Sequence, residues 1–327
     1  MAVPTARWCL RVSTSRTDTM NLTFDLPAVR RWAEFSGDFN PIHFDLAHAR
    51  KAGMDKLIVH GMLALMPIKH MLSQRSVMGA VNDVVGDVVN DVVSDTVSDT
   101  ASAHPSWIKF KAAFRHPLAH DSDHVLITHA SGKKISFQLT SHNGGSSHIE
   151  SESHTSRIEN FRGVFNLADA LPDDIPPTPP TAHCFDIAAQ QLVSFVQTYP
   201  EITSTWVALD AVVFAQFMRH GLPIVEQRVH NALPTASGGS ITFNQDAEQV
   251  NNIVVQTSHA VYVDATLNNA AGHLQWALLA PVLLVQGSQV SGAVSLPIYR
   301  DNRLVMLVEI GLLAKVSRVD HLNESPS

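Results

Sequence analysis

The sequence predicts an α+β protein of two similar units, each built from helices that are followed by antiparallel strands. Three observations lead to this prediction. Apolar side chains recur at helical spacing near the start of each half, and strand-like runs follow them. Five prolines crowd the segment 167–182 between the halves, and such a segment is extended rather than packed. At 327 residues, the chain is long enough for two domains of about 150 residues each.

The first half is expected to open with two helices. The Asp25 carboxylate can cap the first one, and Pro27 in its first turn lacks only an N–H that would have no partner anyway. Gly37 suits the left-handed residue that ends a helix. A second short helix is predicted over 46–51, after a matching cap at Asp45.

Strands are expected to follow in the first half, and the second half repeats the order. The predicted strands of the first half cover 107–115, 123–130, 133–141 and 147–155. In the second half, helices are predicted over 187–198 and 207–219, with Gly221 near the end of the latter. The strand-like runs there cover 252–264, 273–286, 291–297 and 303–314.

These patterns divide the chain into a ragged N-terminus, two folded units and a linker. The predicted segments are 1–20 for the terminus, 21–166 for the first unit, 167–182 for the Pro-rich linker and 183–320 for the second unit. A low-complexity insertion is predicted at 79–104, where aspartates recur at every fourth position. This spacing differs from that of a calcium-binding loop, which also needs a terminal glutamate.

Composition excludes several classes of function. The net charge of −7 and the lack of a basic stripe argue against nucleic acid as a partner. No apolar run approaches the roughly 18–20 residues that span a bilayer, so no membrane span is predicted. Cys9 and Cys184 are too few and too far apart for a disulfide scaffold or a thiolate zinc site. We therefore expect a cytoplasmic protein, with a mitochondrial one as the alternative because Arg, Ser and Thr are frequent in the first twenty residues.

The most informative stretch is the loop after the first helix, which reads FSGDFNPIHFD from Phe35 to Asp45. It sets the carboxylate of Asp38 and the imidazole of His43 five residues apart. Asn40 precedes a proline, which pushes it toward an extended conformation and stiffens the loop. Two titratable groups of different intrinsic pKa, held close together, are what acid–base chemistry on a small substrate or water requires.

This loop resembles the signature of the MaoC-like, or (R)-specific enoyl-CoA hydratase (hydratase 2), family of hot-dog folds. A second block, LIVHGML at 57–63, resembles the entry to the long central helix of that family. A third and weaker match, 107–117, resembles the strand after that helix, so the likeness covers roughly 20–160. The resemblance implies a double hot-dog, in which an antiparallel sheet wraps a long central helix in each of two units. The second unit lacks the loop and is interpreted as degenerate.

The resemblance also implies a reaction. Members of the family reversibly add water to a trans-2-enoyl thioester, so the chain is expected to be a hydro-lyase that needs no cofactor and no metal. Asp38 and His43 would hold the water and exchange protons, and the backbone N–H of Gly61 would bind the thioester oxygen. Asn40 would orient these groups, although a purely structural role in the Asn-Pro turn explains it equally well.

The remaining assignments concern the substrate. Met62 is expected to contact it, and His60 is a candidate contact for which a structural role is favoured. CoA is the expected carrier, with an acyl carrier protein as the alternative, and its phosphates would meet Lys109, Lys111 or Arg115. A homodimer is a further expectation.

One departure from the family pattern concerns the central helix, in which Pro67 is expected to kink or shorten the helix and alter the acyl pocket. Two other functions stay open. One is an acyl-CoA thioesterase with a hot-dog fold, and the other is a non-catalytic hot-dog protein that binds acyl groups, which this departure and the insertion suggest.

Overall fold

The fold is known from a computed structural model, which describes residues 9–11, 17–75, 107–142, 157–168, 170–232, 253–286 and 289–315. The insertion predicted at 79–104 and the strand predicted at 147–155 lie outside the described residues.

The strands form one continuous antiparallel sheet of twelve strands, in the order β1-β2-β4-β5-β6-β3-β8-β12-β11-β9-β7, with β10 paired to β11. The first half of the chain supplies β1 (Cys9–Arg11), β2 (Thr17–Thr23), β3 (Trp107–Phe114), β4 (Asp123–Ser131), β5 (Lys134–His142) and β6 (Arg157–Ala168). The second half supplies β7 (Cys184–Ile187), β8 (Ile253–Asp264), β9 (Leu274–Ala277), β10 (Val282–Gln286), β11 (Gln289–Arg300) and β12 (Arg303–Lys315). The pairing of β3 with β8 joins the two halves at the middle of the sheet.

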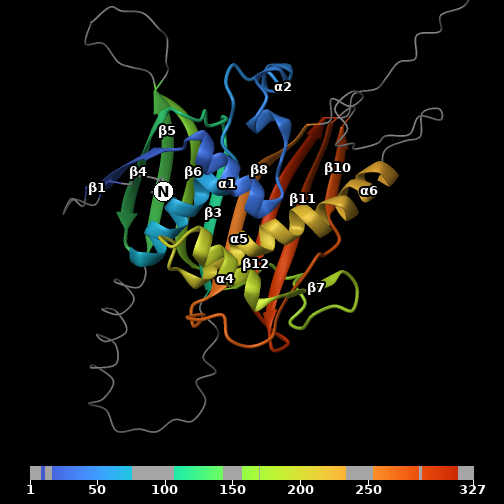
Figure 1. Cartoon of the computed structure of the whole chain (residues 1–327). Coiled ribbons are helices and arrows are strands. Elements are labelled where there is room, and N and C mark those ends of the chain that lie inside the picture. The colour runs from blue at the N-terminus through green and yellow to red at the C-terminus, as the bar shows by residue number, and fades with distance from the viewer. Residues whose placement is uncertain are drawn as a thin grey trace, which may run out of the picture.

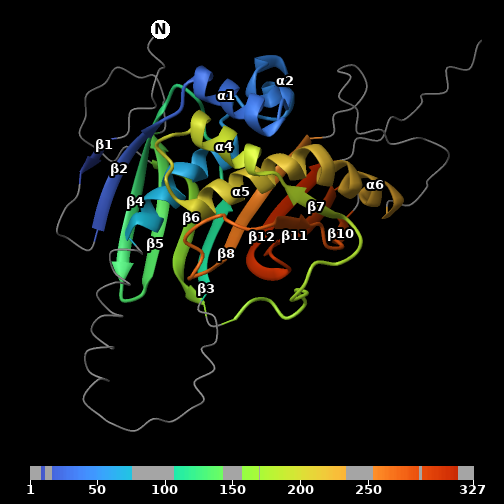
Figure 2. The ribbon, with the colours of Figure 1, turned by 60° about the horizontal axis from the view of Figure 1, so that its bottom comes forward.

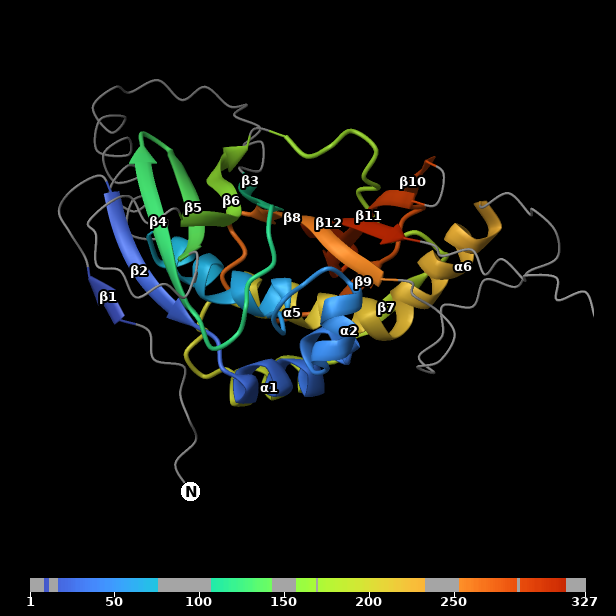
Figure 3. The ribbon, with the colours of Figure 1, turned by 90° about the horizontal axis from the view of Figure 1, so that it is seen from above.

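The helices gather on one face of this sheet, as the view from above shows most clearly (Figures 1, 2 and 3). Before the linker they are α1 (Leu26–Ser36), the 3-10 turn η1 (Pro41–His43), α2 (Leu46–Lys51) and a helix over residues 61–75. After the linker they are α4 (Ala189–Thr198), α5 (Thr205–Gln216), the π-helical turn η2 (Phe217–Gly221) and α6 (Leu222–Ala232).

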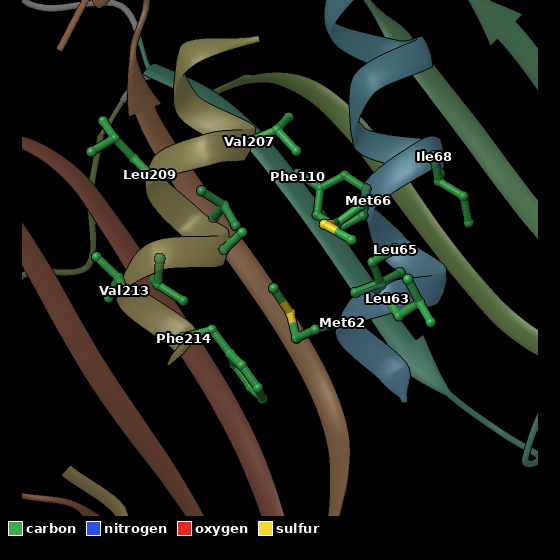
Figure 4. Packing of buried hydrophobic residues seen from close by; sticks show 14 of the residues in the cluster. Met62, Leu63, Leu65, Met66, Ile68, Phe110, Val207, Leu209, Val213 and Phe214 are labelled. Atoms are coloured by element: carbon green, nitrogen blue, oxygen red, sulfur yellow. The ribbon is translucent and has the colours of Figure 1, made fainter. Parts of the chain in front are cut away.

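The core lies between this helical layer and the sheet. The helix over 61–75 and α5 each run over the strands of their own half, and apolar side chains from both fill the space beneath them (Figure 4). Leu65 and Ile68 on the first helix and Leu209 and Val213 on α5 are fully buried. Each half thus contains a central helix wrapped by antiparallel strands, and the predicted double hot-dog is confirmed.

Several local predictions are also confirmed. The Asp25 carboxylate accepts a hydrogen bond from the Ala28 N–H over 2.8 Å and caps α1. Gly37 ends that helix in the left-handed conformation, with φ of 81°. The Asp45 carboxylate caps α2 by accepting from the N–H groups of Ala47 and His48.

Other predictions are wrong in part, because packing overrides the local signal. Residues 61–75 are helical without a break, so Pro67 does not shorten the central helix. Gly221 does not end the helix of the second half, since η2 leads directly into α6. A Cβ at Gly221 would lie 2.5 Å from the Phe217 ring, so this glycine makes room for the wide turn.

Three predicted boundaries also shift. The segment 184–187 forms the strand β7 before its helix begins at Ala189. The run predicted as one strand over 273–286 is split into β9 and β10. At the N-terminus, β2 starts at Thr17 and pairs with β4, ahead of the predicted start of the first unit at residue 21. Within the described residues, no helix combines the length and apolarity that crossing a membrane requires.

Candidate active site

The loop between α1 and α2 holds Asp38 and His43 at the start of the central helix. The N–H of Asp38 donates to Ser36 Oγ over 3.1 Å, and the left-handed Gly37 turns the chain out of α1. The side chain of Asn40 accepts from the Ile42 N–H over 3.3 Å and caps η1, the turn that ends at His43. Local hydrogen bonds therefore fix where the two titratable side chains leave the loop.

His43 is buried, and one of its two ring nitrogens is occupied by the backbone. Nδ1 lies 2.9 Å from the carbonyl oxygen of Ile58, which can only accept, so Nδ1 carries the proton in this contact. Burial lowers the pKa of His43, and the neighbouring Asp38 charge and the Ile58 carbonyl oppose this only in part. The neutral ring thus keeps a lone pair on Nε2, which is the form that a general base requires.

His60 stacks on His43, with the ring centroids 3.6 Å apart and the planes inclined by 29°. Its Nε2 donates to the backbone carbonyl of Asp38 over 2.9 Å and ties the loop to the start of the central helix. Burial lowers the pKa of His60 to about 4, with a further contribution from His43. Nδ1 of His60 is buried and has no hydrogen-bond partner among the described residues, so an acceptor is open there.

The carboxylate of Asp38 completes the group. One of its oxygens lies 4.0 Å from Nε2 of His60, and the side chain keeps 17% of its exposure. One polar atom from each of Asp38, His43 and His60 lies within 4.8 Å of the others. A carboxylate, a neutral imidazole and a second imidazole thus meet at one small volume that water can reach.

The donor set alone could suit a metal ion, because each of the three side chains offers a ligand atom. The arrangement of the rings fits this role poorly. The lone pairs of an imidazole lie in the plane of its ring, and the stacked planes of His43 and His60 direct them side by side rather than toward one point. The geometry is better suited to handling protons than to coordinating an ion.

Gly61 begins the central helix, and His60 is its N-cap, since the His60 carbonyl accepts from the Ala64 N–H over 3.1 Å. The first N–H groups of a helix have no carbonyl within the helix to bind, so that of Gly61 can meet an external oxygen. A Cβ on residue 61 would lie 2.7 Å from the Phe114 ring and 3.0 Å from Gln256 Oε1. Only glycine fits this position without moving those neighbours.

The other residues that were predicted to contact the substrate do not gather around Asp38 and His43. Met62 is 1% exposed, and its sulfur lies 3.7 Å from Nζ of Lys69, so it belongs to the core beside the site. Lys109 packs over the Tyr262 ring, on the side of β3 that faces away from the helices. Lys111 shares that side because side chains alternate along a strand. Arg115 is exposed just after the end of β3, and its charge helps to lower the pKa of Glu159. Among the described residues, no contact ties any of the three cations to Asp38 or His43.

Two side chains of the second unit reach this region, and local sequence patterns do not reveal either. The guanidinium of Arg219, in η2, donates to the Phe35 carbonyl and lies against Gly37. Gln256, near the start of β8, lies against Gly61. Both placements depend on pairing between the halves, which no local motif encodes.

A buried charged cluster also joins the halves next to the site. Lys69 of the central helix donates to the carboxylate of Asp210 on α5, and His259 Nε2 donates to the same carboxylate over 3.0 Å. All three side chains are fully buried. The partners of Lys69 lie far along the chain, so no local sequence pattern predicts this cluster.

Comparison with known proteins agrees with the predicted resemblance. Residues 12–93, which include the loop and the start of the central helix, match the family described as MaoC like domain. A segment of 40 residues is 50% identical to the mitochondrial 3-hydroxyacyl-acyl-carrier-protein dehydratase of Arabidopsis thaliana. That segment spans 12% of this chain and 24% of the relative, so the chain matches about a quarter of that protein.

Similar solved structures include dehydratase domains of polyketide synthases. One is the dehydratase domain of PpsC from Mycobacterium tuberculosis in complex with C12:1-CoA, at 10% identity and a TM-score of 0.39, covering 90% of this chain and 93% of that one. Another is the dehydratase domain of the CurJ module of curacin polyketide synthase, at 12% identity and a TM-score of 0.43, covering 95% of both chains. Because these identities and TM-scores are low, the fold assignment depends on the strand order of this chain and not on the likeness to these structures.

Proposed function

We propose that this protein is a dehydratase of the MaoC-like type that acts on acyl thioesters and catalyses the reversible addition of water to a trans-2-enoyl thioester. The observation that carries the proposal is the neutral imidazole of His43, which keeps Nε2 free beside the Asp38 carboxylate. The match of this segment to the MaoC like domain supports the same activity. The (R) configuration of the 3-hydroxyacyl product is carried over from the resemblance.

In the direction of hydration, Asp38 orients a water molecule by accepting one of its hydrogens. Nε2 of His43 takes the other proton while the water oxygen bonds to C3 of the enoyl group. The electron pair of the double bond moves toward the thioester oxygen, and His43 then returns its proton to C2. One O–H bond and the π bond between C2 and C3 break, one C–O and one C–H bond form, and both side chains recover their starting charge. Proton transfer of this kind typically contributes about 10²–10⁴-fold to the rate.

The start of the central helix stabilises the intermediate. Negative charge builds on the thioester oxygen as the water adds, and the N–H of Gly61 faces that charge at the positive end of the helix. Residue 61 carries no side chain, and the space that a Cβ would take is filled by the Phe114 ring and Gln256 Oε1, which therefore border this N–H. Dehydration follows the same steps in reverse, so the pathway sets the direction.

The proposed substrate carrier is CoA, with an acyl carrier protein as the alternative. Both carriers present the thioester on the same pantetheine arm. Lys109, Lys111 and Arg115 stay predictions as contacts for the phosphates of CoA. The proposed location is cytoplasmic, with mitochondria as the alternative, and microscopy of a fluorescent fusion to the full chain distinguishes them.

Hydration of crotonyl-CoA, followed by the loss of the enoyl-thioester absorbance, tests the proposal. Asp38→Asn and His43→Gln are expected to lower kcat/KM by at least 100-fold while the variants stay folded. Asp45→Asn and His48→Gln are matched controls in the neighbouring helix α2, where asparagine caps a helix as well as aspartate does.

Release of free CoA thiol in the same assay would instead identify a thioesterase. Binding of saturated butyryl-CoA, without either reaction on CoA or carrier-protein thioesters, would identify a non-catalytic acyl-binding protein.

A further inference from the structure

Gln256 brings a polar group from the second unit to the start of the central helix of the first. The pairing of β3 with β8 sets Ala113 opposite Ser258, so the beginning of β8 lies beside the end of β3. At this seam Gln256 Oε1 lies 3.0 Å from the position that a Cβ on Gly61 would occupy. The second unit therefore contributes an oxygen beside Gly61, whose N–H is proposed to bind the thioester oxygen.

The orientation of this amide is fixed by His259. Gln256 Nε2 lies 3.1 Å from Nδ1 of His259 and 3.4 Å from the Ser258 carbonyl. Nε2 of His259 faces the Asp210 carboxylate at 3.0 Å, so it carries the ring proton and Nδ1 is left as an acceptor. Only the amide nitrogen can donate to Nδ1, which turns the amide oxygen toward Gly61.

The carboxylate of Asp210 is in turn held by two donors. Burial disfavours its charge, but His259 and Lys69 outweigh this and lower the pKa of Asp210 to about 2. Burial lowers the pKa of His259, so its ring is neutral beside the ion pair of Lys69 and Asp210. This chain of contacts reaches from the central helix through α5 and β8 back to Gly61, and it leaves the Gln256 amide no second orientation.

We infer that Gln256 is a substrate-contacting residue that accepts a hydrogen bond from the first amide N–H of the pantetheine arm, and that His259 is its positioning residue. The inference rests on the proposed function. An amide oxygen cannot bind the thioester oxygen, because both atoms only accept. The nearest donor on a pantetheine thioester is the amide N–H two carbons beyond the sulfur, a group that CoA and acyl carrier protein share.

A pair of small thioesters that differ only in this N–H tests the inference. Crotonyl N-acetylcysteamine carries the amide, whereas the crotonyl thioester of 5-mercapto-2-pentanone replaces the N–H with CH₂. A net hydrogen bond between neutral groups changes an equilibrium by roughly 2- to 10-fold. Wild-type protein is therefore expected to prefer the amide substrate by about 3- to 10-fold in kcat/KM. Gln256→Ala and Gln256→Met are both expected to remove this preference.

His259→Phe is expected to weaken the same preference, whereas a purely structural role would lower the rate with both substrates equally. Gln227→Ala, an exposed glutamine on α6, is the control. An equal rate of wild-type protein with both thioesters, or an unchanged preference in Gln256→Met, would overturn the inference while hydration itself persists. Absence of hydration of crotonyl-CoA by the wild type would reject the proposed function, and the role of Gln256 with it.

Discussion

The ring of His43 lies stacked on that of His60, and each ring donates one N–H to a backbone carbonyl, of Ile58 and of Asp38 respectively. Two protonated rings at a centroid distance of 3.6 Å would repel each other. The stack therefore stabilises the neutral form of both imidazoles. As the pH falls, protonation of these two rings is therefore expected to lower both the stability of the protein and its activity.

Acid is expected to destabilise the protein through His60. Its pKa falls from 6.5 to about 4 on folding, so the unfolded chain binds more protons between these two values. The free energy of unfolding should drop as the pH falls from about 6.5 to about 4, by about 3 kcal/mol from this group. Urea unfolding at a series of pH values, with wild type and His60→Gln, measures the effect. Equal slopes for the two proteins would contradict this assignment.

Activity is expected to need the neutral form of His43. Because burial lowers the pKa of His43 below the ordinary value of 6.5, the decline of kcat/KM in acid should be centred below pH 6.5. A pH profile of crotonyl-CoA hydration checks this expectation, with EDTA present to remove adventitious metal. A decline centred above the ordinary histidine pKa would contradict the role given to the neutral ring.

Gly61→Ala is expected to damage the site more than the fold. The new methyl group would meet the Phe114 ring at 2.7 Å and the Gln256 oxygen at 3.0 Å, and would displace side chains beside the N–H that is proposed to bind the thioester oxygen. We expect kcat/KM to fall by about 10-fold or more, with a loss of roughly 1–2 kcal/mol in the free energy of unfolding. Gly53→Ala cannot serve as the matched control, because Gly53 has a φ of 82°, at which a residue with a side chain is strained. Ala64→Gly, on the same helix as Gly61, is the control for the change in the free energy of unfolding. Full activity of Gly61→Ala would exclude a close approach of the thioester.

The buried pair of Lys69 and Asp210 predicts a non-additive result. Lys69→Met leaves the carboxylate of Asp210 without its cation and is expected to cost about 3–5 kcal/mol in the free energy of unfolding. Adding Asp210→Asn removes the uncompensated charge and keeps an acceptor for His259, so the double variant should recover much of that loss. Chemical denaturation of the two single variants and the double variant measures the coupling. Additive losses would show that the two side chains do not interact.

Removing the charge of Glu226, which borders a cavity under α6, is expected to stabilise the protein. The cavity is lined mainly by apolar side chains. Burial raises the pKa of Glu226 to about 7 from 4.5, so the folded state loses stability as the pH rises between these values. Glu226→Gln should raise the free energy of unfolding by roughly 1 kcal/mol at pH 8, after allowance for partial exposure, and have little effect at pH 4.5. Glu34→Gln, an exposed residue of α1, is the control, and an equal effect at both pH values would refute this explanation.

Short-range rules predicted the part of the site that short segments build. The caps at Asp25 and Asp45, the left-handed Gly37 and the turn that holds Asn40 depend only on residues within a few positions. Together they fix the loop that carries the acid and the imidazole. Their predicted geometry is therefore confirmed, although their catalytic roles remain a proposal.

What the sequence did not predict depends on contacts between distant segments. The partners of Lys69 and the placement of Gln256 follow from the pairing of β3 with β8, which joins residues about half the chain apart. Helix continuation through Pro67 and Gly221 likewise reflects a buried environment that compensates for unfavourable local residues. No spacing along the chain signals either effect.

Proton nuclear magnetic resonance of the product formed in D₂O tests the central claim most directly. Incubation of crotonyl-CoA with wild-type protein should give 3-hydroxybutyryl-CoA with one deuteron at C2, since the solvent supplies both parts of the added water. Asp38→Asn and His43→Gln should give none above the uncatalysed rate, while Asp45→Asn behaves as wild type. Intact crotonyl-CoA after incubation with the wild type, or free crotonate with CoA thiol, would contradict a hydration site built from Asp38 and His43.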